Sequence, residues 1–141
     1  MADNGSDFAR SMSIATSGLR AQAGRMRVIS ENIANVDSTG PTAGADPYRR
    51  KVPTFSSALD RSLDARVVTL GKIRPDQTAF RIKHEPGNPA ADAAGNVKYP
   101  NVNPLVEMTD MREAQRSYEA NLNIISATRR MIQRTLDILK A

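Results

Sequence analysis

The side chains that most often carry out chemistry in proteins are sparse in this sequence. It holds one histidine, His84, and no cysteine, so it offers no Cys or His cluster of the kind that binds zinc or iron. The adjacent Ser56 and Ser57 lack a nearby base that would activate a hydroxyl nucleophile. The sequence also contains no glycine-rich phosphate loop and no zinc-protease motif. We therefore expect no enzyme activity, no cofactor and no metal site.

A short basic segment, Tyr48–Lys51, is the densest cluster of positive charge in the chain. Its two arginines and one lysine have the chemistry to bind a phosphate, a nucleic acid or an acidic protein surface. Because the segment is short and lies beside turn-forming sequence, a solvated loop is the simpler alternative. We predict that Tyr48–Lys51 contacts another protein subunit, with Tyr48, Arg49 and Arg50 at the interface.

The composition limits the partners that the protein can bind. The net charge of its 141 residues is +5 at pH 7, but the basic residues are dispersed and are not interleaved with aromatic ones, so we expect no nucleic-acid binding. No apolar run approaches the ~18 residues of a membrane span, so we expect no direct insertion into a membrane. Apolar residues make up only 40% of the chain and Trp is absent. Partners are therefore expected to cover part of its hydrophobic surface.

The N-terminal part of the sequence has the heptad pattern of a paired helix. From Phe8 onward, apolar residues recur at alternating steps of four and three, with one polar interruption at Gln22. Turn-forming residues at Asp37–Pro41 predict that this helix ends just after Ala34. The apolar positions of the pattern are Phe8, Met12, Ala15, Leu19, Met26, Ile29 and Ile33.

The C-terminal part of the sequence has a longer heptad pattern. Acidic residues near its start and basic residues near its end suit the dipole of a single long helix. Ile124, Met131 and Ile138 lie beside the pattern and widen the apolar face, which suggests contact with more than one helix. The heptad positions are Met108, Met111, Gln115, Tyr118, Leu122, Ile125, Arg129, Ile132, Leu136 and Leu139.

These patterns predict a mainly α fold in which long N- and C-terminal helices pair as an antiparallel coiled coil. We expect three regions: an N-terminal helix in residues 1–35, a polar middle in residues 36–104 and a C-terminal helix in residues 105–141. In the middle, Arg66–Leu70 and Phe80–His84 have strand patterns and favour a small β-hairpin within an otherwise irregular region. The stretch rich in proline and glycine from Glu85 to Pro104 is expected to be an extended loop.

Other interpretations of these features are open. The apolar heptad residues alone would also fit the core of an ordinary helix pair. A regulatory protein could bind nucleic acid through Tyr48–Lys51 and the arginines at positions 129, 130 and 134, with an affinity that falls steeply with salt. A small helical chaperone or adaptor would share the heptads, but it would not need the proline-rich loop.

Several sequence blocks, taken together, resemble the axial proteins of the bacterial flagellar rod and hook. The segment that closes the N-terminal helix is similar to the Ala-Asn-x-x-Thr signature of that family, and further blocks resemble its proximal-rod members. In chain order the blocks are Asn32–Gly40, Tyr48–Lys51, Glu85–Asp92, Val97–Asn103 and Ser117–Asn121.

The resemblance implies a structural subunit of the proximal rod that assembles helically and transmits torque from the membrane ring to the distal rod and hook. The partners that it implies are copies of the chain, other rod proteins, the adaptor between membrane ring and rod, and the flagellar type III export apparatus. It also implies a location in the periplasm-spanning basal body. Export without a cleaved signal peptide fits the polar start of the sequence, which lacks an apolar signal segment.

A rod that transmits torque needs stiff elements and many staggered contacts between unlike surfaces of neighbouring subunits. Paired terminal helices would supply the stiff elements, and the polar middle would contact neighbours. The residues that we expect at the assembly interface are Leu19, Met26, Ile29, Ile33, Asn35, Tyr48, Arg49, Arg50, Tyr118, Leu122, Ile125, Ile132, Leu136 and Leu139.

Overall fold

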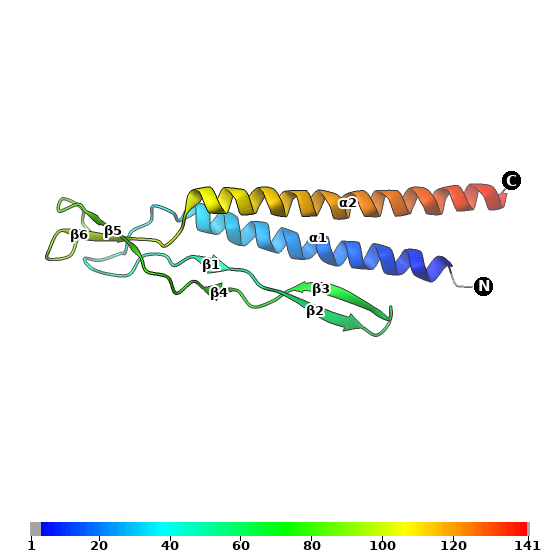
Figure 1. Cartoon of the computed structure of the whole chain (residues 1–141), viewed down its shortest axis with the longest axis horizontal. Coiled ribbons are helices and arrows are strands. Elements are labelled where there is room, and N and C mark those ends of the chain that lie inside the picture. The colour runs from blue at the N-terminus through cyan, green and yellow to red at the C-terminus, as the bar shows by residue number, and fades with distance from the viewer. Residues whose placement is uncertain (1–3, 141) are drawn as a thin grey trace. The chain divides into compact units, whose positions relative to one another are not determined.

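The computed structural model describes residues 4–140, with a long helix at either end of this range (Figure 1). Helix α1 spans Asn4–Ala34 and helix α2 spans Pro104–Lys140. The predicted end of the first helix at Ala34 is confirmed, because the turn-forming residues after it do not continue the helix. Proline at the start of α2 suits the first turn, where its fixed φ is helical and its missing N–H costs no hydrogen bond.

The chain between the two helices forms short strands, which pair as three separate antiparallel two-stranded sheets. The mainly helical fold with a small β-rich middle was predicted from the sequence and is confirmed. The pairs are β1 (Lys51–Val52) with β4 (Arg74–Pro75), β2 (Phe55–Asp60) with β3 (Ala65–Leu70), and β5 (Arg81–His84) with β6 (Asn96–Tyr99).

The strand predictions are confirmed in part. The segment Arg66–Leu70 lies in β3, and the segment Phe80–His84 forms β5 from Arg81 onward, but each strand belongs to its own hairpin, so the structure has two hairpins where one was predicted. The prediction of a loop throughout Glu85–Pro104 is wrong for Asn96–Tyr99, which returns alongside β5 as β6. Alternate side chains of β6 are buried, and that burial favours a strand over a free loop.

The chain divides into two compact units, each assembled from separate segments of sequence. The first unit contains the described residues of Met1–Met26, Thr54–Lys72 and Glu113–Ala141. The second unit contains Arg27–Pro53 and Ile73–Arg112. Within the described range, neither helix has the length and apolar content that crossing a membrane requires.

In the first unit, α1 and α2 pack together. A Cβ atom at Gly18 would lie 2.8 Å from Nδ2 of Asn121, so the absence of a side chain lets α2 approach closely there. An ion pair between the helices has 3.3 Å between the Arg25 guanidinium and the Glu113 carboxylate. The predicted pairing of the two terminal segments as packed helices is therefore confirmed.

The β2–β3 hairpin lies along α1 in the same unit, with β3 nearer to the helix (Figure 1). The backbone N–H of Val68 donates a 3.1 Å hydrogen bond to Oγ of Ser17 on α1. Leu70 lies over Gly24, where a Cβ would stand 2.7 Å from the leucine Cδ2. The turn between the strands ends at Asp64, whose φ of 46° is in the left-handed region that Asp tolerates better than most residues.

The second unit has a small apolar core of its own. Ala90, Val97 and Tyr99 are buried together, and Ala91 packs against them. Alternate residues of β6 point into this core, as the two-residue repeat of a strand requires. This core holds the β5–β6 hairpin, and Val28, Ile29 and Val102 are further buried apolar residues of the unit.

Candidate functional site

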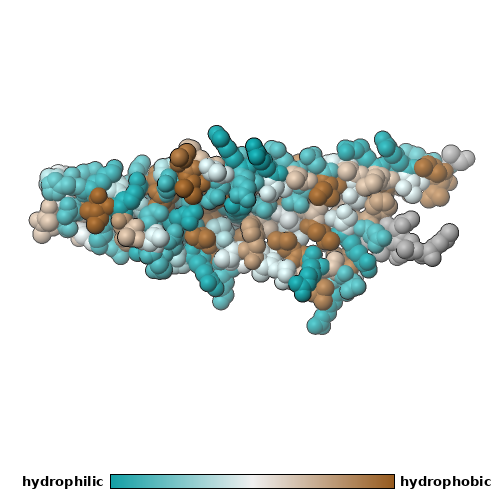
Figure 2. Space-filling model, viewed as in Figure 1, coloured by the Kyte–Doolittle hydropathy of each residue, from teal (hydrophilic) through white to brown (hydrophobic). Residues whose placement is uncertain are grey.

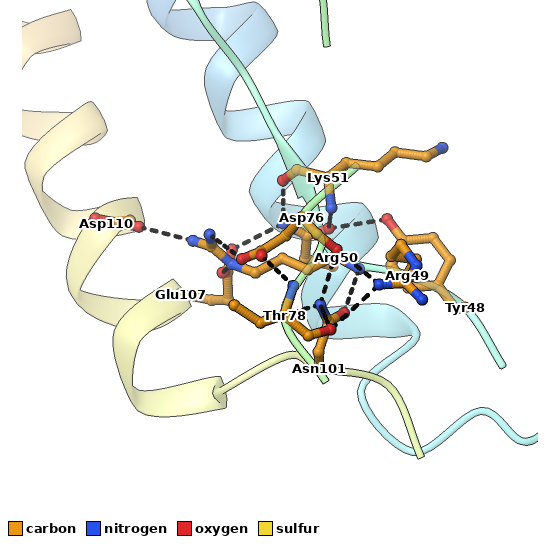
Figure 3. A network of polar contacts seen from close by, with 10 residues as sticks. Tyr48, Arg49, Arg50, Lys51, Asp76, Thr78, Asn101, Glu107 and Asp110 are labelled. Atoms are coloured by element: carbon orange, nitrogen blue, oxygen red, sulfur yellow. Dashed lines mark hydrogen bonds and ion pairs between the residues drawn. The ribbon is translucent and has the colours of Figure 1, made fainter. Parts of the chain in front are cut away.

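A group of polar side chains, all buried or half-buried except that of the exposed Thr78, lies in the second unit, and we call it the polar cluster (Figure 3). Helix α1 supplies one member near its C-terminal end, and helix α2 supplies two in its first turns. The other members come from the segment around β1, the loop after β4 and the residues that precede α2. Its members are Asn32, Tyr48, Arg49, Arg50, Lys51, Asp76, Thr78, Asn101, Glu107 and Asp110.

Asn32 lies at the centre of the polar cluster, with only 1% of its surface exposed. Its Nδ2 donates to the backbone carbonyl of Lys51 at 2.9 Å and to Oε2 of Glu107 at 3.0 Å. Its Oδ1 accepts from the Tyr48 hydroxyl and from the Lys51 backbone N–H, both at 2.9 Å. The amide thus uses both donors and both acceptor positions, which a buried amide needs to avoid an unpaired polar group.

Glu107 is fully buried, and both of its carboxylate oxygens are bonded. Oε1 accepts a 2.6 Å hydrogen bond from Nε of Arg50, while Oε2 accepts the bond from Asn32. The remaining Arg50 nitrogens lie 3.5 Å from a carboxylate oxygen of Asp76 and 3.6 Å from one of Asp110. One guanidinium therefore joins three carboxylates, a geometry that suits the fork of arginine better than the single ammonium of lysine.

The surroundings of the polar cluster raise the pKa values of Arg50 and Tyr48 and lower the pKa of Asp76. Burial opposes the charged form of Arg50, but the hydrogen bond and charge of Glu107 and the charge of Asp76 outweigh it and raise the pKa of Arg50. The backbone N–H of Thr78, with its hydroxyl and the nearby Arg50, lowers the pKa of Asp76 against the opposing effect of burial. Burial raises the pKa of Tyr48 to about 12, and the charge of Glu107 adds to this shift.

Two further side chains hold the loop after β4. Arg49 donates to the backbone carbonyls of Asp76 at 3.0 Å and Thr78 at 3.2 Å, and its guanidinium lies 4.1 Å from the centre of the Phe80 ring. Nδ2 of Asn101 donates to the same two carbonyls and to the Thr78 hydroxyl. The polar cluster therefore ties this loop to both helices of the second unit.

The polar cluster holds protein segments together, because its side chains bond to one another and to backbone groups of distant segments. Glu107 is buried against Arg50 and Asn32, and these two partners occupy both of its carboxylate oxygens. His84 is exposed on β5, and its Nδ1 lies 3.3 Å from Oδ1 of Asn96. Among residues 4–140 no group of three or more His, Asp or Glu side chains could hold a metal ion.

The structure places the basic residues predicted from the sequence inside the second unit. The polar groups of Tyr48, Arg49 and Arg50 bind side chains and carbonyls of their own chain. Lys51 forms an ion pair with Glu31, and its ammonium lies 5.6 Å from the centre of the Tyr48 ring. The polar partners of these residues, Asn32, Asp76, Asn101 and Glu107, were not identified from the sequence. Only Asn32 had a signal in the sequence. It follows Val28 by four residues and Ile29 by three, so it lies on the same buried face of the helix as these two apolar residues.

The remaining predicted site residues are on the two helices, except Asn35, which follows α1 directly, and they differ in burial. On α1, Ile29 is buried and Leu19, Met26 and Ile33 are half-buried, as is Asn35 after the helix. On α2, Tyr118, Ile125 and Ile132 are half-buried. Leu122, Leu136 and Leu139 are exposed, and 78% of the surface of Leu139 is accessible.

The most buried positions of α2 are small or polar residues. Glu107, Ala114 and Thr128 are buried and stand at multiples of seven residues from one another. They alternate with the half-buried heptad positions, which include Met111 and Tyr118. The remaining predicted heptad positions each come one residue after this buried series and are exposed. They are Met108, Gln115, Leu122 and Arg129. Small residues between the helices therefore leave large aliphatic side chains outside the pair.

Helix α2 carries an unusual amount of exposed apolar surface. On the face in Figure 2, apolar side chains, in brown, lie in separate patches among polar ones. The exposed large apolar residues of α2 are Leu105, Val106, Met108, Leu122, Ile124, Met131, Leu136, Ile138 and Leu139. Exposed apolar residues in such number on one element are typical of a surface that another protein covers.

Comparison with known proteins identifies relatives along most of the chain. Residues 12–42 match the family described as "Flagella basal body rod protein", and residues 93–138 match "Flagellar basal body rod FlgEFG protein C-terminal". The flagellar basal-body rod protein FlgC of Agrobacterium fabrum is 56% identical over 91% of this chain and 92% of its own length. FlgC of Bacillus subtilis is 37% identical over 92% of this chain and 97% of its own. FlgC of Aquifex aeolicus is 36% identical over 95% of this chain and 98% of its own.

Proposed function

The chain belongs to the FlgC family of flagellar basal-body rod proteins, and we propose that it is a subunit of the proximal rod that assembles helically through its terminal helices. As a member of this family it is a structural component of the rod. Its location is the flagellar basal body, where it assembles with other rod proteins. We further propose that the assembled rod transmits torque from the membrane ring to the distal rod and hook.

The stiff element of each subunit is an antiparallel coiled coil of α1 and α2. In support, residue numbers fall along α1 as they rise along α2 in the first unit, where Arg25 meets Glu113 and Gly18 meets Asn121. The burial of α2 at heptad spacing also supports it. Two long helices that pack against each other resist bending, and a rod that transmits torque requires this stiffness.

The observation that carries the assembly mechanism is the exposed apolar surface of α2. At its C-terminal end, Leu136 is 45%, Ile138 76% and Leu139 78% exposed. Burial of each such side chain by a neighbouring subunit is worth roughly 1.5–3 kcal/mol. Contacts between unlike surfaces of successive subunits build a helical assembly when the rotation between them does not close a ring.

The chain has neighbours in the rod and an export pathway by which it reaches them. Its neighbours in the rod are copies of the chain, other rod proteins and the adaptor that joins rod and membrane ring. It reaches the periplasm-spanning rod through the flagellar type III export apparatus, without a cleaved signal peptide. Tyr48, Arg49 and Arg50 serve the assembly by shaping the surface of the second unit that faces a neighbour, since their own polar groups bind within that unit.

Basal bodies purified from a strain that carries a tagged copy of the chain test this function. We expect mass spectrometry to detect the chain together with other rod proteins, and we expect deletion of its gene to abolish hooks and swimming. A deletion strain that swims normally, with basal bodies that lack the tagged chain, would contradict a role in the rod.

A further inference from the structure

The outer strand of the β2–β3 hairpin has no neighbour on its far side. Every residue from Phe55 to Leu59 is exposed, whereas the far edge of β3 lies against α1 through the bond from Val68 to Ser17. Within residues 4–140, no segment other than β3 pairs with β2. A two-stranded hairpin of this length is at best marginally stable without a further strand or an apolar surface to pack on.

The register of the hairpin shows which backbone groups of β2 point outward. The N–H of Gly71 donates a 2.7 Å hydrogen bond to the carbonyl of Thr54, so this pair, just outside the strands, is hydrogen-bonded. In an antiparallel pair of strands, hydrogen-bonded and non-hydrogen-bonded residue pairs alternate along the strands. The backbone groups of Ser56 and Ala58, two and four residues after Thr54, therefore face β3.

The intervening residues Phe55, Ser57 and Leu59 direct their N–H and C=O groups away from β3. Val68, which stands opposite Ser57, agrees with this assignment, because its own N–H bonds to the α1 side chain of Ser17. The outer edge of β2 thus offers alternating donors and acceptors at the spacing of a third strand.

The outer edge of β2 also lacks the features that usually protect an exposed strand. It contains no proline and no lysine, and each residue from Phe55 to Asp60 has one partner on β3, so there is no bulge. Phe55 and Leu59 share one face of the hairpin with Val68, and all three side chains are exposed. Arg66 of β3 lies on the same face, where its guanidinium donates a 3.5 Å hydrogen bond to the Ser57 hydroxyl. No charged side chain occurs between Phe55 and Leu59.

We propose that the outer edge of β2 binds an extended segment of a neighbouring rod protein as a third strand. The segment is uncharged and has apolar side chains at alternate positions, because it must cover the apolar face and bury no unpaired charge. This inference rests on the proposed function, since it needs a rod in which a neighbouring subunit lies beside the hairpin. The proposed contact, at the outer edge of β2, lies outside the two helices.

Replacement of Ser57 by proline tests the hydrogen bonds directly. Ser57→Pro removes an outward N–H and the hydroxyl that accepts a 3.5 Å hydrogen bond from Arg66, but it leaves the backbone hydrogen bonds between β2 and β3 intact. Proline is tolerated at the outer position of an edge strand. The matched control is Ser57→Ala, which loses the same hydroxyl and keeps the N–H. We expect both variants to be exported and to have the same melting temperature, and we expect incorporation of the proline variant into rods to fall about tenfold.

A photo-crosslinker at position 57 of assembled rods identifies the occupant and does not depend on the folding of the proline variant. We expect it to join β2 to an uncharged extended segment of another rod protein. Equal incorporation of the proline and alanine variants, or a crosslink from β2 only to β2 of a second copy, would overturn the proposal while the chain remained in the rod. Absence of the unaltered chain from basal bodies would instead overturn the proposed function, and this inference with it.

Discussion

The side chains of Asn32 and Glu107, which stand 75 positions apart in the sequence, form a buried 3.0 Å hydrogen bond between α1 and α2. Neither side chain has more than 1% of its surface exposed. Because Arg50 and Lys51 bind the same pair, a shift of either helix by one residue would leave a carboxylate or an amide buried without partners. The pair is therefore expected to fix the register of the helices in the second unit.

Replacement of Asn32 by aspartate tests this role of the polar cluster. The change keeps the size of the side chain, removes the two hydrogen bonds that Nδ2 donates and places a second carboxylate next to Glu107. We expect Asn32→Asp to lower the free energy of unfolding by about 3–5 kcal/mol, measured by urea denaturation. Asn123→Asp, at an exposed position of α2, is the control and should change it by less than about 0.5 kcal/mol. Equal effects of the two substitutions would show that the pair is not important for stability.

The turn after α1 provides a second test, which concerns packing alone. A Cβ at buried Gly40 would lie 2.5 Å from the backbone oxygen of Ala45, whereas a Cβ at Gly87 would meet nothing within 4 Å. We expect Gly40→Ala to lower the free energy of unfolding by about 1–3 kcal/mol, because the backbone of Ala45 must move. Gly87→Ala should leave it unchanged or raise it slightly. Similar melting temperatures for the two variants would contradict the close contact at Gly40.

Tyr48 gives the polar cluster a measurable alkaline titration. Burial, and then the charges of Glu31 and Glu107, raise its pKa from 10.0 to about 12. The folded state therefore favours the neutral phenol, so the stability that this group contributes is complete below about pH 10 and is lost as the pH rises towards about 12. Spectrophotometric titration of the folded protein should show a phenolate transition near pH 12 that is absent from Tyr48→Phe and present in Tyr118→Phe. If both variants kept this transition, it would belong to another tyrosine.

The sequence predicted the helices well, because a repeat of seven residues is a strong signal over thirty or more positions. It located the contact surface between them less accurately. The pattern was built on large aliphatic residues, and it therefore included Met108 and Leu122, which are exposed. The contact instead uses positions such as Gly18 and Ala114, whose small size permits close packing but gives no hydrophobic signal.

The strands and the polar cluster were harder to predict. The sequence of β2, Phe55–Asp60, contains serine and alanine in place of β-branched residues, so it has little strand propensity and depends on pairing with β3. The polar cluster joins Asn32, Arg50 and Glu107 from distant parts of the chain. No local pattern shows that a charged residue near the start of a helix will be buried, because its partners are brought to it only by the fold.

The C-terminal end of α2 carries the most direct test of the rod mechanism. Leu136 is 45% exposed in the isolated chain, so a charged residue there should leave folding and export intact. In the rod, its burial by a neighbour would make the same charge cost several kcal/mol, because roughly 1.5–3 kcal/mol of apolar burial is lost and a charge is desolvated. Arg130→Ser changes an exposed residue of the same helix and serves as the control.

The decisive measurement is the number of hook-bearing basal bodies per cell, counted by electron microscopy in strains whose only copy of the chain carries Leu136→Asp or Arg130→Ser. We predict that the Leu136→Asp chain is made and exported, while its cells have almost no hooks and do not swim, and that Arg130→Ser cells resemble the parent strain. Normal numbers of hooks in the Leu136→Asp strain would contradict assembly through the C-terminal helix.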